Sequence, residues 1–479
     1  MRTVRTVPDK EHNLNNSKNV IIIGGGAAGM AASVFLAKAG CSVQLYEKNE
    51  KLGKKLYITG KGRCNFTNAC AEEEFLSHVV TNPRFLYSAF AGFTNHDAIQ
   101  FFEELGLRTK VERGNRAFPA SDHSSDVIRV LEREMRACGV EISLLTEVQG
   151  IITEEAGDPV TDADNAEKKC PENQTDVQHL EKQRTEADDS RKTGKKCSQA
   201  AARRICGVRL ADGSEVFADV VIVATGGLSY PSTGSTGDGY RFAEQCSVPV
   251  TACRPSLVPL LTAEAYIPQM QGLSLKNVTL TIHYGKKGKK TFSEFGEMLF
   301  THEGISGPLV LSASAVTGAS LQETGRLPAE IDLKPALTEE QLDARILREF
   351  ENGRNKALKN VIASLLPAKM RPVIMECAGI APEKPVHDIT RAERQKLISV
   401  IKAFPLTICG QGSYREAVIT QGGVSVKAVN PKTMECKTVR GLYFIGEVLD
   451  LDAVTGGFNL QIAWSTAHAA AEAITEEAE

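Results

Sequence analysis

A glycine-rich turn lies between an apolar run and a helical pattern near the start of the sequence. Residues 20–23 form a short β-branched run, Gly24-x-Gly26-x-x-Gly29 follows it directly, and apolar residues then recur at helical spacing until Gly40. Ser42–Glu47 alternates like a second strand. This order predicts a βαβ unit with a parallel pair of strands, so the chain is expected to open as an α/β, Rossmann-type fold.

The glycine spacing has a mechanical cause. The first glycine permits a tight turn, the second lets the backbone approach a pyrophosphate, and the third lets the helix pack closely on the sheet. The helix N-terminus then offers N–H groups and partial positive charge to the phosphates. Glu47, at the end of the second strand, can accept hydrogen bonds from ribose hydroxyls. We therefore predict that a dinucleotide is bound through its adenosine half by Gly24, Gly26, Gly29 and Glu47.

A late segment indicates which dinucleotide is bound. Residues 441–445 read as a strand that ends in Gly446-Glu447, and residues 455–461 open a helix with Thr-Gly-Gly. A carboxylate after the strand can bind ribityl hydroxyls, and a helix N-terminus can face the flavin N1 and C2 carbonyl. The pair favours FAD over NAD. The predicted contacts are Gly446, Glu447, Gly456, Gly457, Asn459, Leu460 and Gln461, with Thr225 and Gly226 after the strand-like residues 219–224.

The chain has 479 residues and is too long for a single core, so we expect several domains. We predict an FAD-binding domain in three parts (1–153, 205–248 and 405–479), an inserted β-rich, barrel-like domain (249–335) and a small helical domain (336–404). Residues 154–204 contain 22 charged residues among 51 and no aromatic residue, which predicts a flexible insertion. A docking tail is the alternative for that segment.

Composition narrows the class of partner. The formal net charge of -3 gives no global field that would attract a nucleic acid. The twelve cysteines contain no C-x-x-C pair and no zinc spacing, so we expect no metal site. The N-terminus has no signal-peptide pattern and no run long enough to span a membrane is visible. We expect a soluble, cytoplasmic protein that acts on a small molecule and binds no nucleic acid; the short lysine run at 286–290 is read as a solvated hairpin tip.

Four strings in order resemble the BaiN-like, or aminoacetone-oxidase-like, family of flavoproteins. They are ITGKGRCNFTN at residues 58–68, GSTGDGY at 234–240, FTHEGISGP at 300–308, and residues 441–461. The resemblance covers the chain except for 154–204, and it implies an FAD domain, a β-barrel and a helical domain. Lys61 stands where the family usually has a third glycine, and Ala453 where a glycine is common. Both departures fall in loops that the resemblance places near the flavin.

The resemblance also implies further binding residues. It suggests that Ala27 and Ala28 offer backbone N–H groups to the pyrophosphate, that Lys48 joins Glu47 at the adenosine, and that Val148 meets the adenine through its backbone. It places a further set at the flavin or its phosphates: Lys54, Gly60, Arg63, Cys64 and Asn65. Arg63 as a surface ion-pair partner and Cys64 as a packing residue are the structural alternatives.

Three residues are candidates for acid or base catalysis. His302 lies in a shaped Gly/Pro loop, and histidine is the usual side chain for acid or base catalysis near neutral pH, while Tyr230 and Tyr240 flank the glycine-rich residues 229–239. A purely structural histidine is the alternative for His302.

These patterns predict an FAD-dependent oxidoreductase. The resemblance includes 3-dehydro-bile acid delta-4,6-reductases, so the specific hypothesis is reduction of C=C bonds conjugated to a ketone in 3-oxo-delta-4,6 bile acids. No second G-x-G-x-x-G is present, so NAD(P)H is expected to visit the flavin transiently. The alternatives are a flavin oxidase acting on a small amine or carbonyl compound, and a flavin-dependent RNA-modifying or RNA-binding protein. The resemblance also implies that the small-molecule substrate is apolar and bears a ketone.

Overall fold

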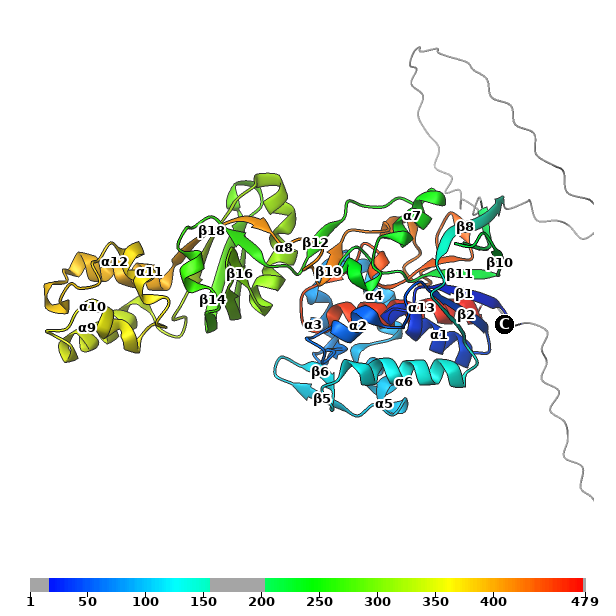
Figure 1. The fold of residues 1–479 in the computed structure, drawn as a ribbon, viewed down its shortest axis with the longest axis horizontal. Helices are drawn as coiled ribbons and strands as arrows, with labels where there is room; N and C mark the ends of the chain where they lie inside the picture. The colour runs from blue at the N-terminus through cyan, green and yellow to red at the C-terminus, as the bar shows by residue number, and fades with distance from the viewer. Residues whose placement is uncertain (1–16, 156–202, 477–479) are drawn as a thin grey trace, which may run out of the picture.

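The protein is described by a computed structural model that covers residues 17–155 and 203–476. Figure 1 shows three parts in a row: a large α/β domain, a barrel beside it, and a group of helices at the far end. The first and last segments of the chain share the α/β domain, as expected. Within the described ranges, no helix combines the length and apolarity needed to cross a membrane.

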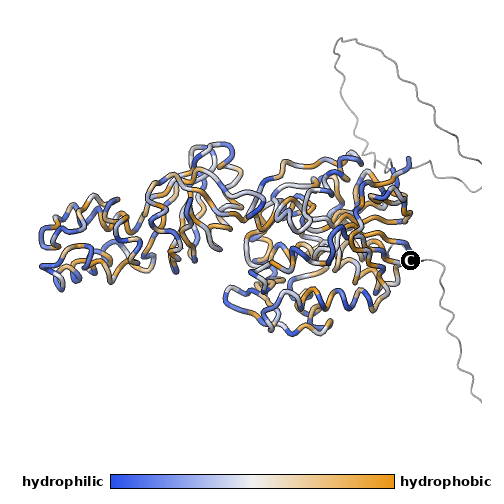
Figure 2. Tube along the Cα trace, in the orientation of Figure 1, coloured by the Kyte–Doolittle hydropathy of each residue, from blue (hydrophilic) through white to orange (hydrophobic). Residues whose placement is uncertain are grey.

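The α/β domain is built on a five-stranded sheet with the order β21-β11-β1-β2-β7. All four neighbouring pairs are parallel, which confirms the predicted βαβ opening. The central strands β1 and β11 are apolar except for Asn19, whereas β2 and β7 also contain polar residues. Figure 2 shows hydrophobic and hydrophilic segments mixed through this domain. Their bounds are β1 Asn19–Ile23, β2 Ser42–Glu47, β7 Glu141–Leu144, β11 Val220–Val223 and β21 Leu442–Phe444.

Helices cover this sheet. The helix α1 (Ala27–Lys38) packs against both α13 (Phe458–Glu476) and α6 (Ser124–Ala137). Both α1 and α13 are rich in alanine and buried on most sides, because small side chains let helices approach closely. The other helices of this domain are α2 Lys54–Ile58, α3 Glu72–Phe75, α4 Pro83–Gly92, α5 Asn95–Glu104 and α7 Asp238–Gln245.

Three small sheets complete the domain. In the first, β8 (Val148–Glu155) and β9 (Arg203–Leu210) are antiparallel partners, so the expected charged insertion leaves from a strand pair; its residues 156–202 lie outside the described ranges. The strands β10 (Glu215–Phe217) and β20 (Val439–Arg440) flank β9. The second sheet has the order β3 (Thr67–Asn68), β6 (Arg116–Pro119), β5 (Thr109–Glu112), and the third pairs β22 (Asp452–Ala453) with β4 (Val79–Thr81).

The second domain is a closed six-stranded barrel with the order β13-β16-β15-β14-β17-β18. The alternating segment at 274–283 is β14, as predicted. The predicted boundary at 405 is wrong, because the barrel closes only when β18 returns from the helical domain to pair with β13 and β17. The bounds are β13 Leu260–Thr262, β14 Ser274–Tyr284, β15 Lys290–Phe300, β16 Gly304–Ser306, β17 Leu327–Asp332 and β18 Phe404–Gln411, with α8 Pro308–Thr324 packed on the barrel.

The helical domain is inserted between β17 and β18. Its longest helices begin at capping boxes, where Thr338 and Thr390 each bond the backbone N–H of the third helical residue. The helices share one continuous apolar core with the barrel, so the two domains are packed together. Their bounds are α9 Glu339–Asn352, α10 Leu358–Val361, α11 Arg371–Ala378 and α12 Arg391–Lys402.

Two antiparallel strands carry the chain between the α/β domain and the barrel. They are β12 (Arg254–Ser256) and β19 (Ile419–Gln421), and the Arg254 Nε donates to Gln421 Oε1 at 2.6 Å. Gln421 Nε2 in turn donates to Asp452 Oδ2 at 2.9 Å, while Asp452 Oδ1 is buried without a hydrogen-bond partner among the described residues. Burial raises the pKa of the Asp452 carboxyl to about 6, with the nearby Asp450 adding to the rise and Arg254 opposing it.

The burial of the Asp452 carboxyl predicts that the stability of the folded protein depends on pH. Because the folded-state pKa of Asp452 lies above its ordinary value of 3.8, its contribution to stability is full below pH 3.8 and is lost as the pH rises through about 6. The loss amounts to at most ~3 kcal/mol. Asp452→Asn should therefore melt at a higher temperature than the wild type at pH 7.5, and the difference should shrink towards pH 5. A difference that grows on acidification would contradict the assignment.

Candidate functional site

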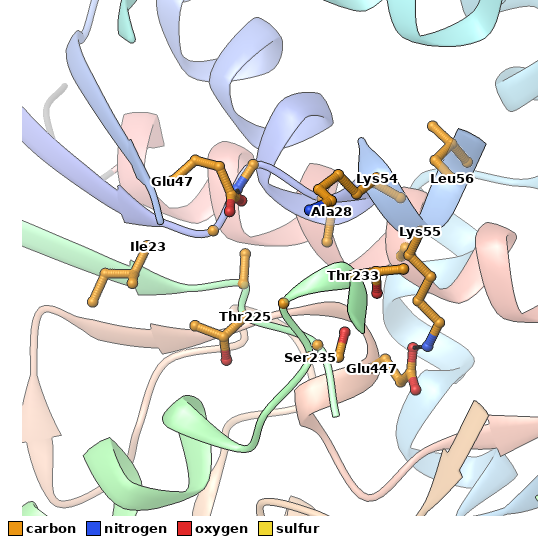
Figure 3. Close-up of a pocket in the computed structure, with 18 of the residues that line it drawn as sticks. Ile23, Ala28, Glu47, Lys54, Lys55, Leu56, Thr225, Thr233, Ser235 and Glu447 are labelled. Carbon is orange, nitrogen blue, oxygen red and sulfur yellow. Dashed lines mark hydrogen bonds and ion pairs between the residues drawn. The ribbon is translucent and has the colours of Figure 1, made fainter. Parts of the chain in front are cut away.

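A deep cleft opens where the parallel strands of the central sheet end. Its floor is the turn after β1 and the N-terminus of α1, and its walls come from the ends of β2, β11 and β21 and from α2. Figure 3 shows side chains of these elements pointing into one space. The carboxyl edge of a parallel sheet is the usual ligand site in such folds. The predicted residues that line the cleft are Gly24, Gly26, Ala27, Ala28, Glu47, Lys48, Lys54, Val148, Thr225, Gly226, Glu447, Asn459 and Leu460.

The glycine turn is fitted to a phosphate group. At Gly29 an added Cβ would lie 2.0 Å from the Gly24 carbonyl oxygen, so only glycine lets α1 approach the turn. At Gly26, in contrast, an added Cβ would meet no atom within 4 Å, so this backbone faces open space in the cleft. The first-turn N–H groups of a helix have no partner inside it, and those of Ala27 and Ala28 border the cleft. Thr225 Oγ1, also at the cleft, is buried without a hydrogen-bond partner among the described residues. These features fit an FAD pyrophosphate.

Glu47 is fixed at the end of the cleft where the adenosine half is expected. Its Oε2 accepts from the Gly25 N–H at 2.7 Å, and its Oε1 accepts from the Asn49 N–H at 2.8 Å and from Asn49 Nδ2 at 2.6 Å. The carboxylate therefore ties the end of β2 to the glycine turn. A carboxylate has about four acceptor positions, so capacity remains for a ribose hydroxyl.

The segment after β2 is bridged to the loop before α7. Lys48 Nζ lies 2.5 Å from Asp238 Oδ2 and donates to Thr236 Oγ1 at 2.6 Å. Asn49 Nδ2 donates to the Thr233 carbonyl at 3.1 Å. Two parts of the chain almost 190 residues apart therefore form opposite rims of the cleft. Predicted Lys54 lines it too, with its ammonium between Asn49 and Glu50.

The end of the cleft where the flavin is expected carries a polar network that sequence reasoning found only in part. Lys55 Nζ donates to Glu447 Oε2 and to Ser229 Oγ, both at 2.6 Å. Glu447 Oε1 accepts from Ser229 Oγ at 2.6 Å and from the Thr420 N–H at 2.9 Å. Figure 3 shows Lys55 reaching from α2 towards Glu447. Glu447 was predicted, whereas Lys55 was missed; its place next to Lys54 on a short helix facing the glycine turn was the available signal.

Close packing requires glycine at Gly446 and Gly457 in the late segment. A Cβ at Gly446 would lie 2.8 Å from the Ala28 Cβ, and one at Gly457 would lie 2.4 Å from the Thr67 carbonyl oxygen. Gly456 also has a left-handed φ of 127°. Asn459 lines the cleft and bonds both backbone groups of Ala453. Gln461 is fully buried and bonds Thr67, Phe93 and Ser465, which gives it a packing role, and its flavin contact stays a prediction.

The residues 60–65 lie beside the cleft lining. Arg63 forms ion pairs with Glu112 and Asp122 and stacks over Phe118, which is the structural alternative named above. Cys64 is fully buried and burial raises the pKa of its thiol, so it is held as a neutral packing residue. Gly60 has a left-handed φ of 62°, and the buried Asn65 Oδ1 has no hydrogen-bond partner in the described ranges.

The three candidate acids or bases are not assembled at the cleft. His302 is exposed on the turn between β15 and β16 of the barrel. Tyr240 is buried beneath Gly227, and burial raises the pKa of its phenol. Tyr230 is half-buried, and its backbone N–H bonds the Tyr414 carbonyl. None of these three described side chains lines the cleft, so their catalytic roles stay predictions.

The second and third glycines of the motif, Gly26 and Gly29, give a matched pair of tests. Gly29→Ala should lower the free energy of unfolding of the apoprotein by about 2–4 kcal/mol, because the new Cβ collides with backbone. Gly26→Ala should change that free energy by less than about 1 kcal/mol. The same Gly26→Ala protein should lose FAD affinity at least about tenfold, since its methyl group enters the phosphate space. Denaturant unfolding and FAD titration measure both, and intact FAD affinity in Gly26→Ala would refute the assignment.

A second test concerns Glu47. Glu47→Gln keeps the shape but removes the charge, so charge-assisted bonds of roughly 1.5–3 kcal/mol should weaken. FAD affinity should fall by about ten- to hundredfold. Because Glu47 lies at the opposite end of the cleft from Lys55 and Glu447, turnover at saturating FAD should change little. Full FAD affinity together with lost flavin reduction would mean that the dinucleotide runs the other way.

Comparison with known proteins agrees with this architecture. Residues 18–173 match the description "HI0933-like protein Rossmann domain". Residues 254–419 match "HI0933-like protein barrel and H2TH domain". The second range ends within β19, in agreement with a barrel that includes β18.

Three curated relatives match almost the whole chain. A ribosomal RNA dihydrouridine synthase of Haemophilus influenzae is 33% identical over 95% of this chain and 98% of its own length. A ribosomal RNA dihydrouridine synthase of Escherichia coli is 29% identical over 95% of this chain and 97% of its own. A 3-dehydro-bile acid delta(4,6)-reductase of Clostridium scindens is 27% identical over 95% and 98%. The chain therefore belongs to the HI0933-like family of FAD-dependent oxidoreductases.

Proposed function

We propose that this protein is an FAD-dependent reductase that adds two hydrogens across a carbon–carbon double bond conjugated to a carbonyl group, and that its substrate is a uracil base in ribosomal RNA. The product would be dihydrouridine. In uracil the C5=C6 bond is conjugated to the C4 carbonyl, so a hydride can be accepted at C6 and a proton at C5.

One observation carries the choice of substrate. The 33% identity to a ribosomal RNA dihydrouridine synthase runs through 95% of this chain and 98% of that protein, so the α/β, barrel and helical parts are all included. The bile-acid reductase is less similar, but its reaction name describes the same kind of double bond. The two relatives thus support one chemistry with different substrates.

The residues of the cleft suit this chemistry. Bound FAD would supply hydride transfer. The glycine turn and Glu47 would hold the adenosine half, while Glu447 and Asn459 would meet the flavin half. Lys55, held by Glu447 and Ser229, keeps a cation at that end. A fixed positive charge there stabilises negative charge that develops during the reaction.

The second candidate is the reduction of a 3-oxo-delta-4,6 bile acid, the reaction expected from the family resemblance. The 27% identical relative favours it, and the apolar Val418 and Ile419 at the cleft could contact a steroid. NAD(P)H as electron donor stays a proposal for both substrates. No observation on the site favours the oxidase alternative.

The deciding experiment compares the two substrates directly. FAD-loaded protein with NADH or NADPH should convert uridine to dihydrouridine in ribosomal RNA from cells that lack this enzyme, seen by mass spectrometry as a gain of two hydrogens in one fragment. The same protein should leave a 3-oxo-delta-4,6 bile acid unchanged. Glu47→Gln protein saturated with FAD serves as a positive control. Turnover of the bile acid without RNA reduction would select the second candidate.

A further inference from the structure

Two basic segments stand out against the acidic balance of the chain. Residues 51–63 contain five cations and no acid, and residues 108–116 contain four cations and one acid. Together these 22 residues have a formal charge of +8, whereas the whole chain has -3. We call the surface formed by the two segments the basic rim. Its charge is hidden in the net charge of the sequence because the remainder of the chain is acidic.

The fold brings the two segments together. The Phe66 N–H bonds the Ala117 carbonyl at 3.0 Å, and β3 pairs with β6 of the β5–β6 hairpin. Arg63, from the first segment, pairs with Glu112 in the second. Figure 1 shows β5 and β6 along the edge of the α/β domain below α2. The basic rim is therefore one continuous surface.

This surface begins at the cleft. Lys54, Lys55, Leu56 and Thr59 line the cleft from α2 and the residue after it. Tyr57, on the same helix, points to solvent with 51% of its surface exposed, and Lys51 Nζ lies 5.3 Å from the centre of its ring. An exposed aromatic ring among cations, next to the flavin end, is a surface on which a nucleic-acid base can stack.

The outer cations of the basic rim remain available to a ligand. Arg63 and Lys110 are engaged by Glu112 and Asp122, which neutralises them. Lys61 and Arg113 are exposed, and Arg116 lies between Arg113 and Phe118. Lys61 also has a left-handed φ of 58°, between Gly60 and Gly62, a backbone state that favours glycine. A lysine kept in that state at an exposed turn is expected where its charge is used.

We propose that the basic rim is the docking surface for the RNA substrate, with Lys61, Arg113 and Arg116 contacting phosphates and Tyr57 stacking on a base next to the reduced uridine. The proposal rests on the proposed function. Cations spread from the cleft along a hairpin match the spaced charges of a nucleic-acid backbone. A bile acid has a single carboxylate, so its binding would need only one of these cations.

The test measures RNA binding by full-length, FAD-loaded protein. The probe is a fluorescent uridine-rich single strand, titrated between low and high salt. The variant Lys61→Gln, Arg113→Gln, Arg116→Gln should lose about two from the slope of log affinity against log salt, at ~0.7 per phosphate contact. If the affinities converge near 1 M salt, Kd should rise by about 100-fold at 0.1 M.

A matched control removes three exposed cations elsewhere on the same domain. Lys427→Gln, Lys432→Gln, Arg440→Gln changes the net charge equally, near β20 and away from the β5–β6 hairpin. It should leave the slope within the error of the wild type. FAD content and melting temperature show that both triple variants are folded, and Lys61→Gln alone provides a milder variant, with a slope loss of about 0.7.

Stacking is tested separately. Tyr57→Ala should raise Kd by about tenfold at every salt concentration, while Tyr57→Phe should keep wild-type affinity, because stacking needs the ring and does not depend on salt.

The proposal is overturned if the wild type does not bind the RNA, if both triple variants weaken binding equally, or if the rim variant keeps the wild-type slope. Competition by polyglutamate at the same charge concentration as effectively as by RNA would reassign the surface to an acidic protein. RNA binding that depends on the basic rim, without dihydrouridine formation, would leave the docking surface intact and refute the proposed reaction. If the rim variant forms dihydrouridine with an unchanged KM for RNA, the proposed reaction stands and docking at the basic rim is refuted.

Discussion

The contact between α1 and the glycine turn is the constraint on which the site depends. Gly29 packs against the Gly24 carbonyl so closely that no Cβ fits, and this contact fixes the N-terminus of α1 at the edge of the sheet. The open space above Gly26 exists because of it. Glu47 then holds the same turn from the next strand through the Gly25 N–H. One turn therefore sets both the phosphate position and the ribose position.

The other end of the cleft depends on contacts between distant segments. Lys55 belongs to α2, Ser229 follows β11, Thr420 lies on the strand that returns from the barrel, and Glu447 follows β21. The barrel and helical domain are inserted between Ser229 and Thr420. Movement of these domains would therefore shift Thr420 and, through its hydrogen bond, Glu447 in the cleft. The hydrogen bond between the buried Gln421 and Asp452 lies at the same junction.

The proposed function combines a cleft that fits FAD with a basic surface beside it. The net charge of -3 favoured a small-molecule substrate over a nucleic acid in the sequence analysis. That charge is a sum over all 479 residues and says nothing about where the charges lie. Electrostatic attraction between exposed charges is screened within about 8–10 Å, so local charge governs docking and net charge has little bearing on it. The basic rim shows how an acidic protein can present a cationic surface beside its cleft.

The sequence by itself determined the βαβ opening, the dinucleotide turn, the acid at Glu47 and the late Gly446-Glu447 segment, because each depends on residues that are close along the chain and on backbone geometry that glycine permits. It also predicted the barrel and helical domains, through the family resemblance, but missed that β18 closes the barrel. Only the tertiary structure decided that Lys55 meets Glu447, that Arg63 pairs with Glu112 and Asp122, that Gln461 packs inside, and that two basic segments form one surface. These contacts join residues up to 394 positions apart, and such pairings follow from the packing of whole elements, which local periodicity does not encode.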